Sequence, residues 1–244
     1  MGTTTRALLG WVMLGGLVLA CQPSATAPRG TDAAANSRER FPGKAGIEWV
    51  FSKPAGLYFA KTETTEAQFR ACIEDSACSW DIFGTSAKDS ECNFGYEERG
   101  SHPMNCTTLP EAKVFCAWAG GRLPTAGEWG AEASNAGTRT YPWGRAKPSC
   151  GRAVMGDGRG MHGCGREGTW PVCSRPSGNS VSGLCDMSGN VWEDCTPADG
   201  SHGMCGGSWR FDYPDEARAS SRRTGGNPDG RGGPYGFRCV RPSP

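Results

Sequence analysis

The sequence predicts an α+β domain that is rich in loops and stapled by disulfides, and three observations lead to this fold class. The chain of 244 residues contains 37 glycines and 17 prolines without a collagen-like period, which is typical of irregular backbone. It contains 13 cysteines, a number typical of covalently braced secreted domains. Nine tryptophans and nine phenylalanines are enough to anchor one sizeable core.

The charge balance excludes two classes of protein. Charged residues make up only 21% of the chain and the formal net charge is +1, so a disordered polyelectrolyte is excluded. A near-neutral chain also lacks the electrostatic basis for binding nucleic acid, and we expect no nucleic-acid partner. The composition therefore favours a secreted, loop-rich domain over a helical cytosolic enzyme.

Three short helices are predicted from capping boxes, in which a threonine is followed three residues later by Glu or Gln. Apolar residues at helical spacing follow each box. Beyond Gly137 no helical period remains, and we expect short strands over 206–211 and 236–240. The three capping pairs are Thr65 with Gln68, Thr108 with Glu111, and Thr125 with Glu128.

The N-terminus predicts export and a lipid anchor. Arg6 precedes an apolar run over 7–20, which describes a secretory signal too short to span a membrane stably. Leu19-Ala20-Cys21 resembles the bacterial lipobox, in which the cysteine is diacylated and becomes the first mature residue. An ordinary signal peptide with a chance cysteine at its end is the alternative.

This interpretation divides the chain into three parts and places it in a compartment. We expect a lipoprotein signal peptide over 1–20, a flexible tether rich in Pro, Ala, Ser and Thr over 21–44, and one domain over 45–242. The mature protein is expected to be a bacterial membrane lipoprotein that faces the periplasm or the cell surface. Gln22, rather than Asp, after the lipidated cysteine favours the outer membrane by resemblance to known sorting.

The cysteines are expected to be structural. Lipidation of Cys21 leaves an even number, which suits disulfides in an oxidising compartment. No Cys-x-x-Cys occurs and the three histidines, His102, His162 and His202, are scattered, so neither a zinc knuckle nor a histidine-based catalytic metal site is predicted. The arginines between Arg218 and Arg241 are expected to donate to backbone carbonyls rather than to form an anion site.

Five sequence blocks, in this order, resemble the formylglycine-generating enzyme family, also called the sulfatase-modifying factor domain. The resemblance extends over 61–242 and implies an α+β, C-type-lectin-like fold with little regular secondary structure. The blocks are NCTTLPEAKVFCAWAGGRLPTAGEW at 105–129, YPWG at 141–144, GLCDMSGNVWE at 183–193, GGSW at 206–209 and GFRC at 236–239.

The family's enzyme oxidises a cysteine of a client sulfatase to formylglycine, using molecular oxygen and copper held by two cysteines. Two soft thiolates suit Cu(I), but the positions that match those cysteines are Phe211 and Glu216. Ser208 matches the family's active-site serine, and a serine cannot replace the thiolate pair. We therefore expect no copper, no catalytic residue, and a non-catalytic binding or accessory module for a peptide, a glycan or a partner protein.

Two catalytic alternatives remain open at this point. The first is a formylglycine-generating oxidase, or a related oxidoreductase that acts on protein cysteine, as the family resemblance implies. The second is a sulfoxide synthase, because this domain also occurs fused to an iron-binding helical bundle. Neither such a bundle nor a His-rich motif is found in this sequence, so we rank that alternative last.

The resemblance also implies a structural calcium loop and one long-range disulfide. In the loop, Asp186 and Glu193 supply side-chain oxygens and Gly189 and Val191 supply carbonyls, a hard-oxygen set that suits Ca²⁺. The alternative is that the two carboxylates only cap turns. The implied disulfide joins Cys116 to Cys239, and the simplest scheme pairs the other cysteines locally as Cys72–Cys78, Cys92–Cys106, Cys150–Cys164, Cys173–Cys185 and Cys195–Cys205.

Overall fold

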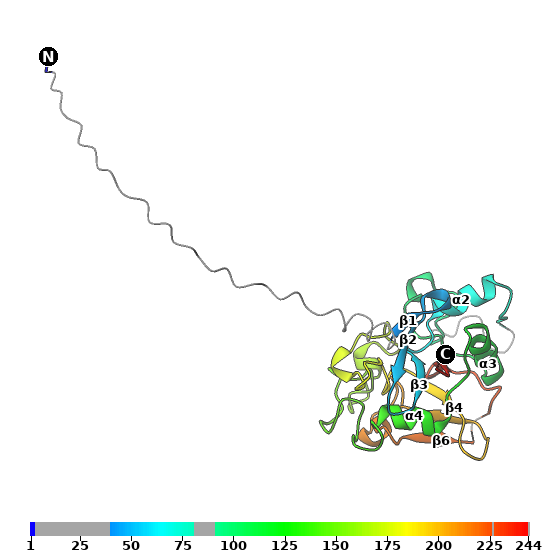
Figure 1. Cartoon of the computed structure of the whole chain (residues 1–244). Coiled ribbons are helices and arrows are strands. Elements are labelled where there is room, and N and C mark those ends of the chain that lie inside the picture. Colours follow the sequence, from blue (N-terminus) through cyan, green and yellow to red (C-terminus); the bar gives the residue numbers. More distant parts are fainter. Residues whose placement is uncertain (3–39, 81–90, 226, 244) are drawn as a thin grey trace, which may run out of the picture.

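The strands form two four-stranded sheets, and the last strand of the chain belongs to the first sheet. This computed structural model describes residues 1–2, 40–80, 91–225 and 227–243, so Cys21, the signal sequence and most of the tether lie outside the described residues. Figure 1 shows the C-terminal end returning to the β1–β3 strands. The first sheet has the order β1 (Arg40–Pro42), β2 (Glu48–Ser52), β3 (Leu57–Ala60) and β8 (Val240–Arg241), all antiparallel.

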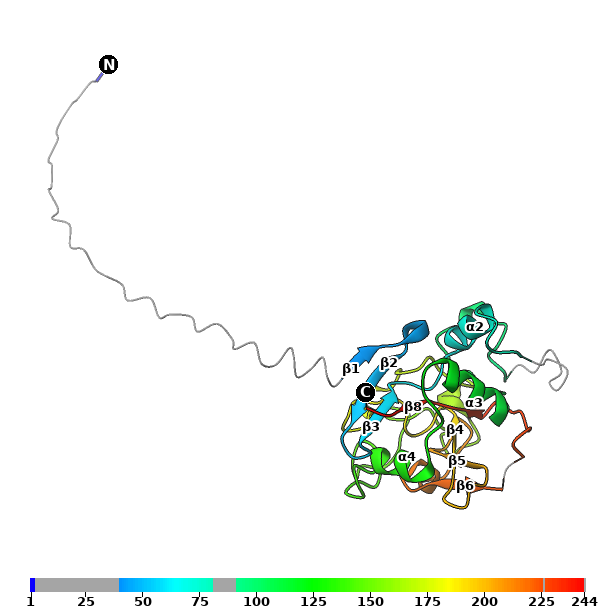
Figure 2. The same ribbon diagram turned by 45° about the vertical axis from the view of Figure 1, so that its right-hand side comes forward.

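The second sheet brings together the segments that carry the family blocks. Figure 2 shows β4, β5 and β6 of this sheet next to α4. β4 and β7 run parallel, whereas the other neighbours are antiparallel. The order is β6 (Arg222–Thr224), β5 (Gly203–Cys205), β4 (Trp192–Cys195) and β7 (Tyr235–Gly236).

Each of the three predicted helices starts at its predicted capping box. In every case the threonine hydroxyl accepts the amide of the residue three positions on, and that residue's side chain accepts the threonine amide. Such caps stabilise a helix by about 1 kcal/mol each. The helices are α2 (Glu66–Glu74), α3 (Leu109–Trp118) and α4 (Ala126–Ala133), and the 3₁₀ turns are η1 (Lys44–Gly46), η3 (Glu97–Arg99), η4 (Gly163–Gly165), η5 (Pro176–Gly178) and η6 (Pro214–Ala217).

The strands predicted over 206–211 and 236–240 are largely wrong. β5 ends at Cys205, and the next two residues have positive φ, +98° at Gly206 and +80° at Gly207, which turns the chain out of the sheet. A Cβ on Gly207 would lie 2.7 Å from the Glu216 carbonyl oxygen and from the Phe211 ring. The glycines therefore serve a tight turn rather than a strand. In the second case only Gly236 and Val240, at the two ends of the predicted range, lie in strands.

An aromatic cluster joins two helices to the C-terminal block. Phe69 of α2 and Phe115 of α3 stack with ring centroids 5.7 Å apart, and Phe237 packs on Phe115 edge to face at 5.5 Å. All three rings are fully buried. Trp129 of α4 belongs to a second cluster, which contains residues of both sheets, among them Phe59 of β3 and Cys195 of β4. The blocks of the family signature thus lie mainly in the core, where apolar burial stabilises the fold.

Six disulfides brace the described chain, and they are the six pairs of the expected scheme. Cys116 of α3 bonds to Cys239, next to β8, across 123 positions. In the chain-entropy model a loop of this length stabilises the fold by about 4–5 kcal/mol, more than the local bridges do. The helices and strands are short, and the disulfides link segments of the chain covalently.

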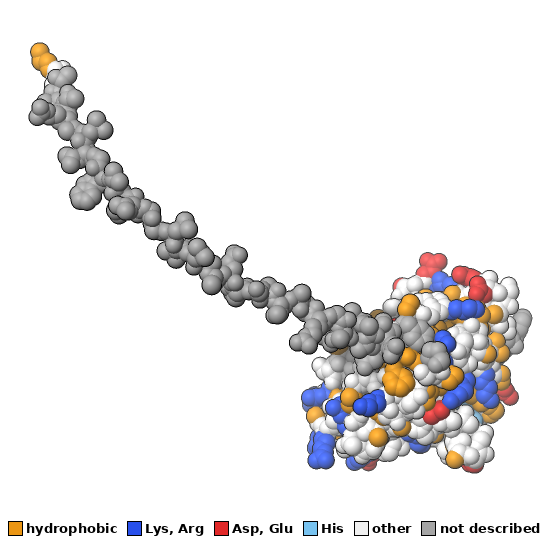
Figure 3. All heavy atoms as spheres, viewed as in Figure 1, with side chains coloured by type: hydrophobic (Ala, Val, Ile, Leu, Met, Phe, Trp, Pro, Cys, Tyr) orange, Lys and Arg blue, Asp and Glu red, His pale blue; other side chains and the backbone are white. Residues whose placement is uncertain are grey.

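The surface charge is unevenly placed. On the face shown in Figure 3, Asp and Glu side chains gather at the end that carries α2, whereas Lys and Arg side chains gather at the opposite end. Among the residues described, no helix has the length and apolar character needed to cross a membrane.

Candidate functional site

The chain after β5 carries the residues that match the family's active site. Ser208 is only 1% exposed, and its hydroxyl accepts the Arg210 amide at 3.3 Å. Trp209 is 2% exposed and donates its indole N–H to the Gly233 carbonyl at 3.2 Å. The serine of the family's site therefore lies in closed packing rather than at the base of an open groove.

The first thiolate position is filled by an apolar ring. Phe211 is buried and packs with Tyr141, Ala153, Met155 and Ala217. The close approach of Gly207 to this ring leaves no room for a side chain between them. An aromatic ring offers no metal ligand, and here it contributes to a small satellite core.

The second thiolate position is a partly exposed carboxylate. Glu216 lies in η6, and its pKa is raised by burial and by the charge of Asp212, with Arg223 acting in the opposite direction. A carboxylate is a hard ligand and a poor match for Cu(I), which prefers thiolates. The twelve cysteines of the described residues are all disulfide-bonded, so this part of the chain holds no thiol to replace the missing pair.

The loop between Asp186 and Glu193 leads into the second sheet, and its two terminal carboxylates have different surroundings. Glu193 pairs with Arg238 through two 2.6 Å hydrogen bonds and also accepts the Trp129 indole N–H at 2.7 Å. Asp186 accepts the Cys173 amide at 2.6 Å. Glu193 is thus held by two donors, whereas Asp186 is bound by one backbone amide.

A third carboxylate, which sequence reasoning missed, braces the same loop. Glu63 is fully buried, and it accepts the Asn190 side-chain amide at 2.9 Å and the Val191 backbone amide at 3.2 Å. Its only sequence signal is its place two residues before the capping Thr65. That signal does not reveal a partner more than 120 positions away in the chain.

The two carboxylates of the loop belong to a buried group of ionisable side chains. Glu63, Asp186 and Glu193 experience the charge of Arg238, and Asp186 also experiences that of Arg175. Burial and the neighbouring carboxylates raise the pKa of Glu63 well above its usual range, which favours its neutral form, and burial raises the pKa of Asp186 to about 6. The oxygen donors of Asp186 and of the loop carbonyls fit calcium by their type. Over 40–80, 91–225 and 227–243, no three His, Cys, Asp or Glu side chains are grouped so as to hold a metal ion.

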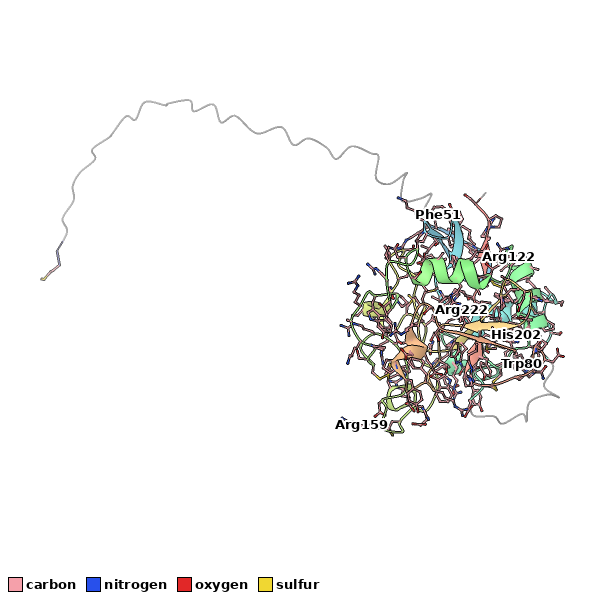
Figure 4. All side chains as sticks on the ribbon, turned by 90° about the horizontal axis from the view of Figure 1, so that it is seen from below. Phe51, Trp80, Arg122, Arg159, His202 and Arg222 are labelled. Carbon is pink, nitrogen blue, oxygen red and sulfur yellow. A yellow bond between two sulfur atoms is a disulfide. The ribbon has the colours of Figure 1, made fainter. Side chains whose placement is uncertain are left out.

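A polar cavity of about 330 Å³ opens beside the second sheet, away from Phe211. Arg223 of β6 lines it and lies over the Trp192 ring at 5.7 Å. His202, labelled in Figure 4, lines it too, with its Nε2 2.8 Å from the buried Asp194 carboxylate. The other polar residues of its lining are Thr224, Asn227, Arg231 and Tyr235. This volume falls within the range of small-molecule sites.

Comparison with known proteins agrees with these blocks and this fold. Residues 49–243 match the model of the sulfatase-modifying factor enzyme 1-like domain. The chain belongs to this family. A family of this kind supplies a scaffold, and the residues at the site decide what each member does.

Curated relatives within the family differ in activity. The chain is 33% identical to inactive C-alpha-formylglycine-generating enzyme 2 of Bos taurus over 163 residues, which are 60% of this chain and 52% of that protein. It is 38% identical to the formylglycine-generating enzyme of Mycobacterium tuberculosis over 104 residues, 39% of this chain and 33% of the relative. It is 36% identical to hercynine oxygenase of Mycolicibacterium smegmatis over 120 residues, 47% of this chain and 25% of the relative. The chain thus spans between a quarter and about a half of these proteins.

Solved structures support the same fold for this family member. PvdO from Pseudomonas aeruginosa superimposes with a TM-score of 0.62 at 20% identity, covering 83% of this chain and 97% of that one. CarF superimposes with a TM-score of 0.57 at 21% identity, covering 76% and 86%. At such identity the likeness concerns the fold alone.

Proposed function

We propose that this protein is a non-catalytic member of the sulfatase-modifying factor family, a surface or periplasmic lipoprotein whose domain binds a peptide, a glycan or a partner protein. One observation carries the proposal: the two positions of the copper-binding thiolates hold a buried phenylalanine and a carboxylate. Phe211 contributes to a core, and Glu216 is a hard ligand. The domain therefore has the fold of the family without the two thiolates that bind copper.

Two further observations support this proposal. The described cysteines are all bound in disulfides, so they include no other pair of free thiols that could bind copper. Ser208 lies in closed packing, while the polar cavity beside β6 is of a size that accepts a small ligand or a side chain of a larger one. One relative, inactive C-alpha-formylglycine-generating enzyme 2, shows that members of this family without activity exist.

The test is copper loading followed by an oxygen-uptake assay. The protein, with its disulfides intact, is titrated with Cu(I) against a competing chelator and is then mixed with cysteine-containing peptides. We expect no stoichiometric copper and no oxygen uptake above that of free copper. The double variant Phe211→Cys, Glu216→Cys is the matched control, because it restores both thiolate positions and is expected to take up one copper per chain. One tightly bound copper with peptide oxidation by the unaltered protein would establish the oxidase alternative and overturn this proposal.

We also propose that the 186–193 loop holds a structural calcium ion, with Asp186 as its main carboxylate ligand. The buried Asp186 carboxylate, which accepts the Cys173 amide, and the hard-oxygen donors of the loop support this assignment. A ligand that binds only the native state raises the melting temperature by mass action. Chelation is therefore expected to lower the melting temperature of the protein, but not that of Asp186→Ala, whereas the exposed-loop variant Asp199→Ala is expected to respond like the unaltered protein. Identical melting curves with and without chelator would remove calcium from the account.

The proposed membrane anchor is the lipid on Cys21. Replacement of Cys21 by Ser is expected to move the protein from the detergent phase to the aqueous phase after Triton X-114 partition. Gln22→Asp, which keeps the cysteine, is expected to stay in the detergent phase and to report on sorting between membranes. A Cys21→Ser variant that remains in the detergent phase would contradict the lipobox assignment.

A further inference from the structure

A second pocket, of about 400 Å³, lies between α4 and the segment that leads into β6. Three arginines line it, Arg139, Arg218 and Arg222, and no Asp or Glu is among the described residues of its wall. The rest of the wall is formed by glycine, alanine, serine and threonine. The pocket thus combines concentrated positive charge with small hydroxyl-bearing side chains.

Arg222 has backbone acceptors but no acidic partner. Its guanidinium donates to the carbonyls of Ala219, Ser221 and Ala126 at 3.1, 2.6 and 3.1 Å, which is the carbonyl capping expected from the sequence. It also lies over the Trp129 ring, 4.9 Å from the centroid, and in Figure 4 it is seen beside α4. No carboxylate of the described residues lies within 4.0 Å of it, and burial lowers its pKa to about 10. Carbonyl dipoles bind this group without neutralising its charge.

The acidic groups near this pocket leave two of its three arginines, Arg139 and Arg222, without an ion-pair partner among the described residues. On α4, Glu128 pairs with Arg122, and the buried Glu132 accepts hydrogen bonds from three serines. Arg218 pairs with Asp215, whose side chain is 83% exposed, so that pair is screened by water. The excess of positive charge in the pocket therefore remains.

Two glycines of α4 line this pocket, and one of them is required for the position of Arg222. A Cβ on Gly130 would lie 2.3 Å from Nη2 of Arg222, so only glycine lets the guanidinium pass beside the helix. Gly127 also lines the pocket, and its Cβ position is open, with no neighbouring atom closer than 3.9 Å. Each glycine costs a helix about 1 kcal/mol relative to alanine, a cost that is large for eight residues. The two glycines thus lower the stability of α4, and Gly130 leaves the space that the Arg222 guanidinium occupies.

We propose, against the sequence-based expectation that the arginines between Arg218 and Arg241 form no anion site, that this pocket binds a phosphate or sulfate monoester of a small hydrophilic molecule, with Arg139, Arg218 and Arg222 around the oxyanion. Guanidinium groups bind such oxyanions through charge-assisted hydrogen bonds. The pocket volume of about 400 Å³ exceeds that of a bare oxyanion and suits an ester of sugar size. The hydroxyls of such a sugar would face the serine and threonine side chains of the pocket. The pocket contains neither Phe211 nor Glu216, so the inference stands whether or not the domain is catalytic.

Isothermal titration calorimetry on the intact protein tests this inference. Glucose 6-phosphate, glucose 6-sulfate, inorganic phosphate and glucose serve as the four probes, at low salt. We expect one of the two esters to bind at least tenfold more tightly than inorganic phosphate, and glucose not to bind. The preferred ester identifies phosphate or sulfate as the physiological group. No binding of either ester, or glucose binding equal to that of the esters, would overturn the proposal.

Variants locate the binding in this pocket. Gly127→Glu places a carboxylate in the pocket without a clash and is expected to lower the affinity for the ester at least tenfold, whereas Gly127→Gln, of the same size, is expected to lower it less. Arg222→Gln is expected to weaken binding by tenfold or more, whereas the exposed Arg159→Gln on a distant loop is expected to have no effect. Equal affinities for Gly127→Glu and Gly127→Gln would show that the ester binds elsewhere and would contradict the assignment.

Discussion

The loop over 186–193 and the segment over 206–217 both carry blocks that match the family. They differ in which of the family's residues each region has. In the loop, the match to the family coincides with a dense buried network, in which Glu193 pairs with Arg238 and Glu63 holds the loop backbone. In the other segment Gly-Gly-Ser-Trp is present, but the reactive positions after it have become Phe211 and Glu216. The family blocks are thus matched where they hold the fold, whereas Phe211 and Glu216 stand at the positions that the family resemblance assigns to the copper-binding cysteines.

The two regions also differ in how they are stabilised. The loop is held in part by the buried ion pair of Glu193 and Arg238, and loss of one partner of such a pair leaves a buried charge uncompensated. The segment depends on an aromatic ring in a small apolar cluster. Substitutions should therefore affect the two regions through different mechanisms and by different amounts.

The largest effect is expected at the buried ion pair. Arg238→Met leaves the fully buried Glu193 carboxylate without its partner, and it should lower the free energy of unfolding by about 3–5 kcal/mol. Arg122→Met is the matched control, because that pair with Glu128 is half exposed and should contribute less than about 1 kcal/mol. Urea unfolding with intact disulfides measures both. Equal losses for the two variants would show that the buried network does not stabilise the loop.

A somewhat smaller effect is expected at the former thiolate position. Phe211→Ala removes a buried ring and should cost about 3 kcal/mol, whereas Phe211→Leu, which keeps most of the volume, should cost about 1 kcal/mol. The measurement is again urea unfolding. If Phe211→Ala were as stable as the unaltered protein, the ring would not be a core residue, and its replacement of the thiolate would need another explanation.

The helix cap at Thr125 should contribute less to the free energy of unfolding than Arg238 or Phe211 does. Thr125→Ala removes the hydroxyl that accepts the Glu128 amide and should cost about 1 kcal/mol. Thr125→Ser keeps the hydroxyl and should cost only a few tenths of a kcal/mol. Thermal unfolding separates the two, and a Ser variant as unstable as the Ala variant would argue against a capping role.

The smallest effect concerns pH. Burial, with the charges of Arg99 and Arg166, lowers the pKa of His102, so the folded state keeps this imidazole neutral when the unfolded chain already protonates it. The unfolded state then binds more protons, and stability should fall as the pH drops below about 6.5. His102→Gln should lose part of this dependence between pH 7 and pH 5. An unchanged pH profile would exclude His102 as its source.

Local patterns predicted the helices well because their signals lie within a few residues. Thr65, Thr108 and Thr125 each start a helix, since a capping box is complete in four positions. The strands over 206–211 were wrongly expected, because apolar and aromatic residues after Gly206 indicate burial but not which secondary structure buries them.

Parts of the candidate site could not be predicted for a similar reason. Glu63 meets Asn190 across 127 positions, and Arg222 meets α4 across 96, and no local pattern encodes such encounters. Phe211 and Glu216 were predicted as the replaced thiolate positions only through the resemblance to a family. The pocket beside Arg222 depends on Gly130, whose importance is visible only in three dimensions.

The state of the cysteines tests the central claim most directly. The native protein is alkylated without reduction, digested, and examined by mass spectrometry for labelled cysteines and for linked peptides. We expect no alkylated cysteine within 40–243 and a linked pair of peptides that joins Cys116 to Cys239. Two alkylated cysteines in that range, with Cu(I) bound to both, would contradict the claim that this family member has lost its thiolate chemistry.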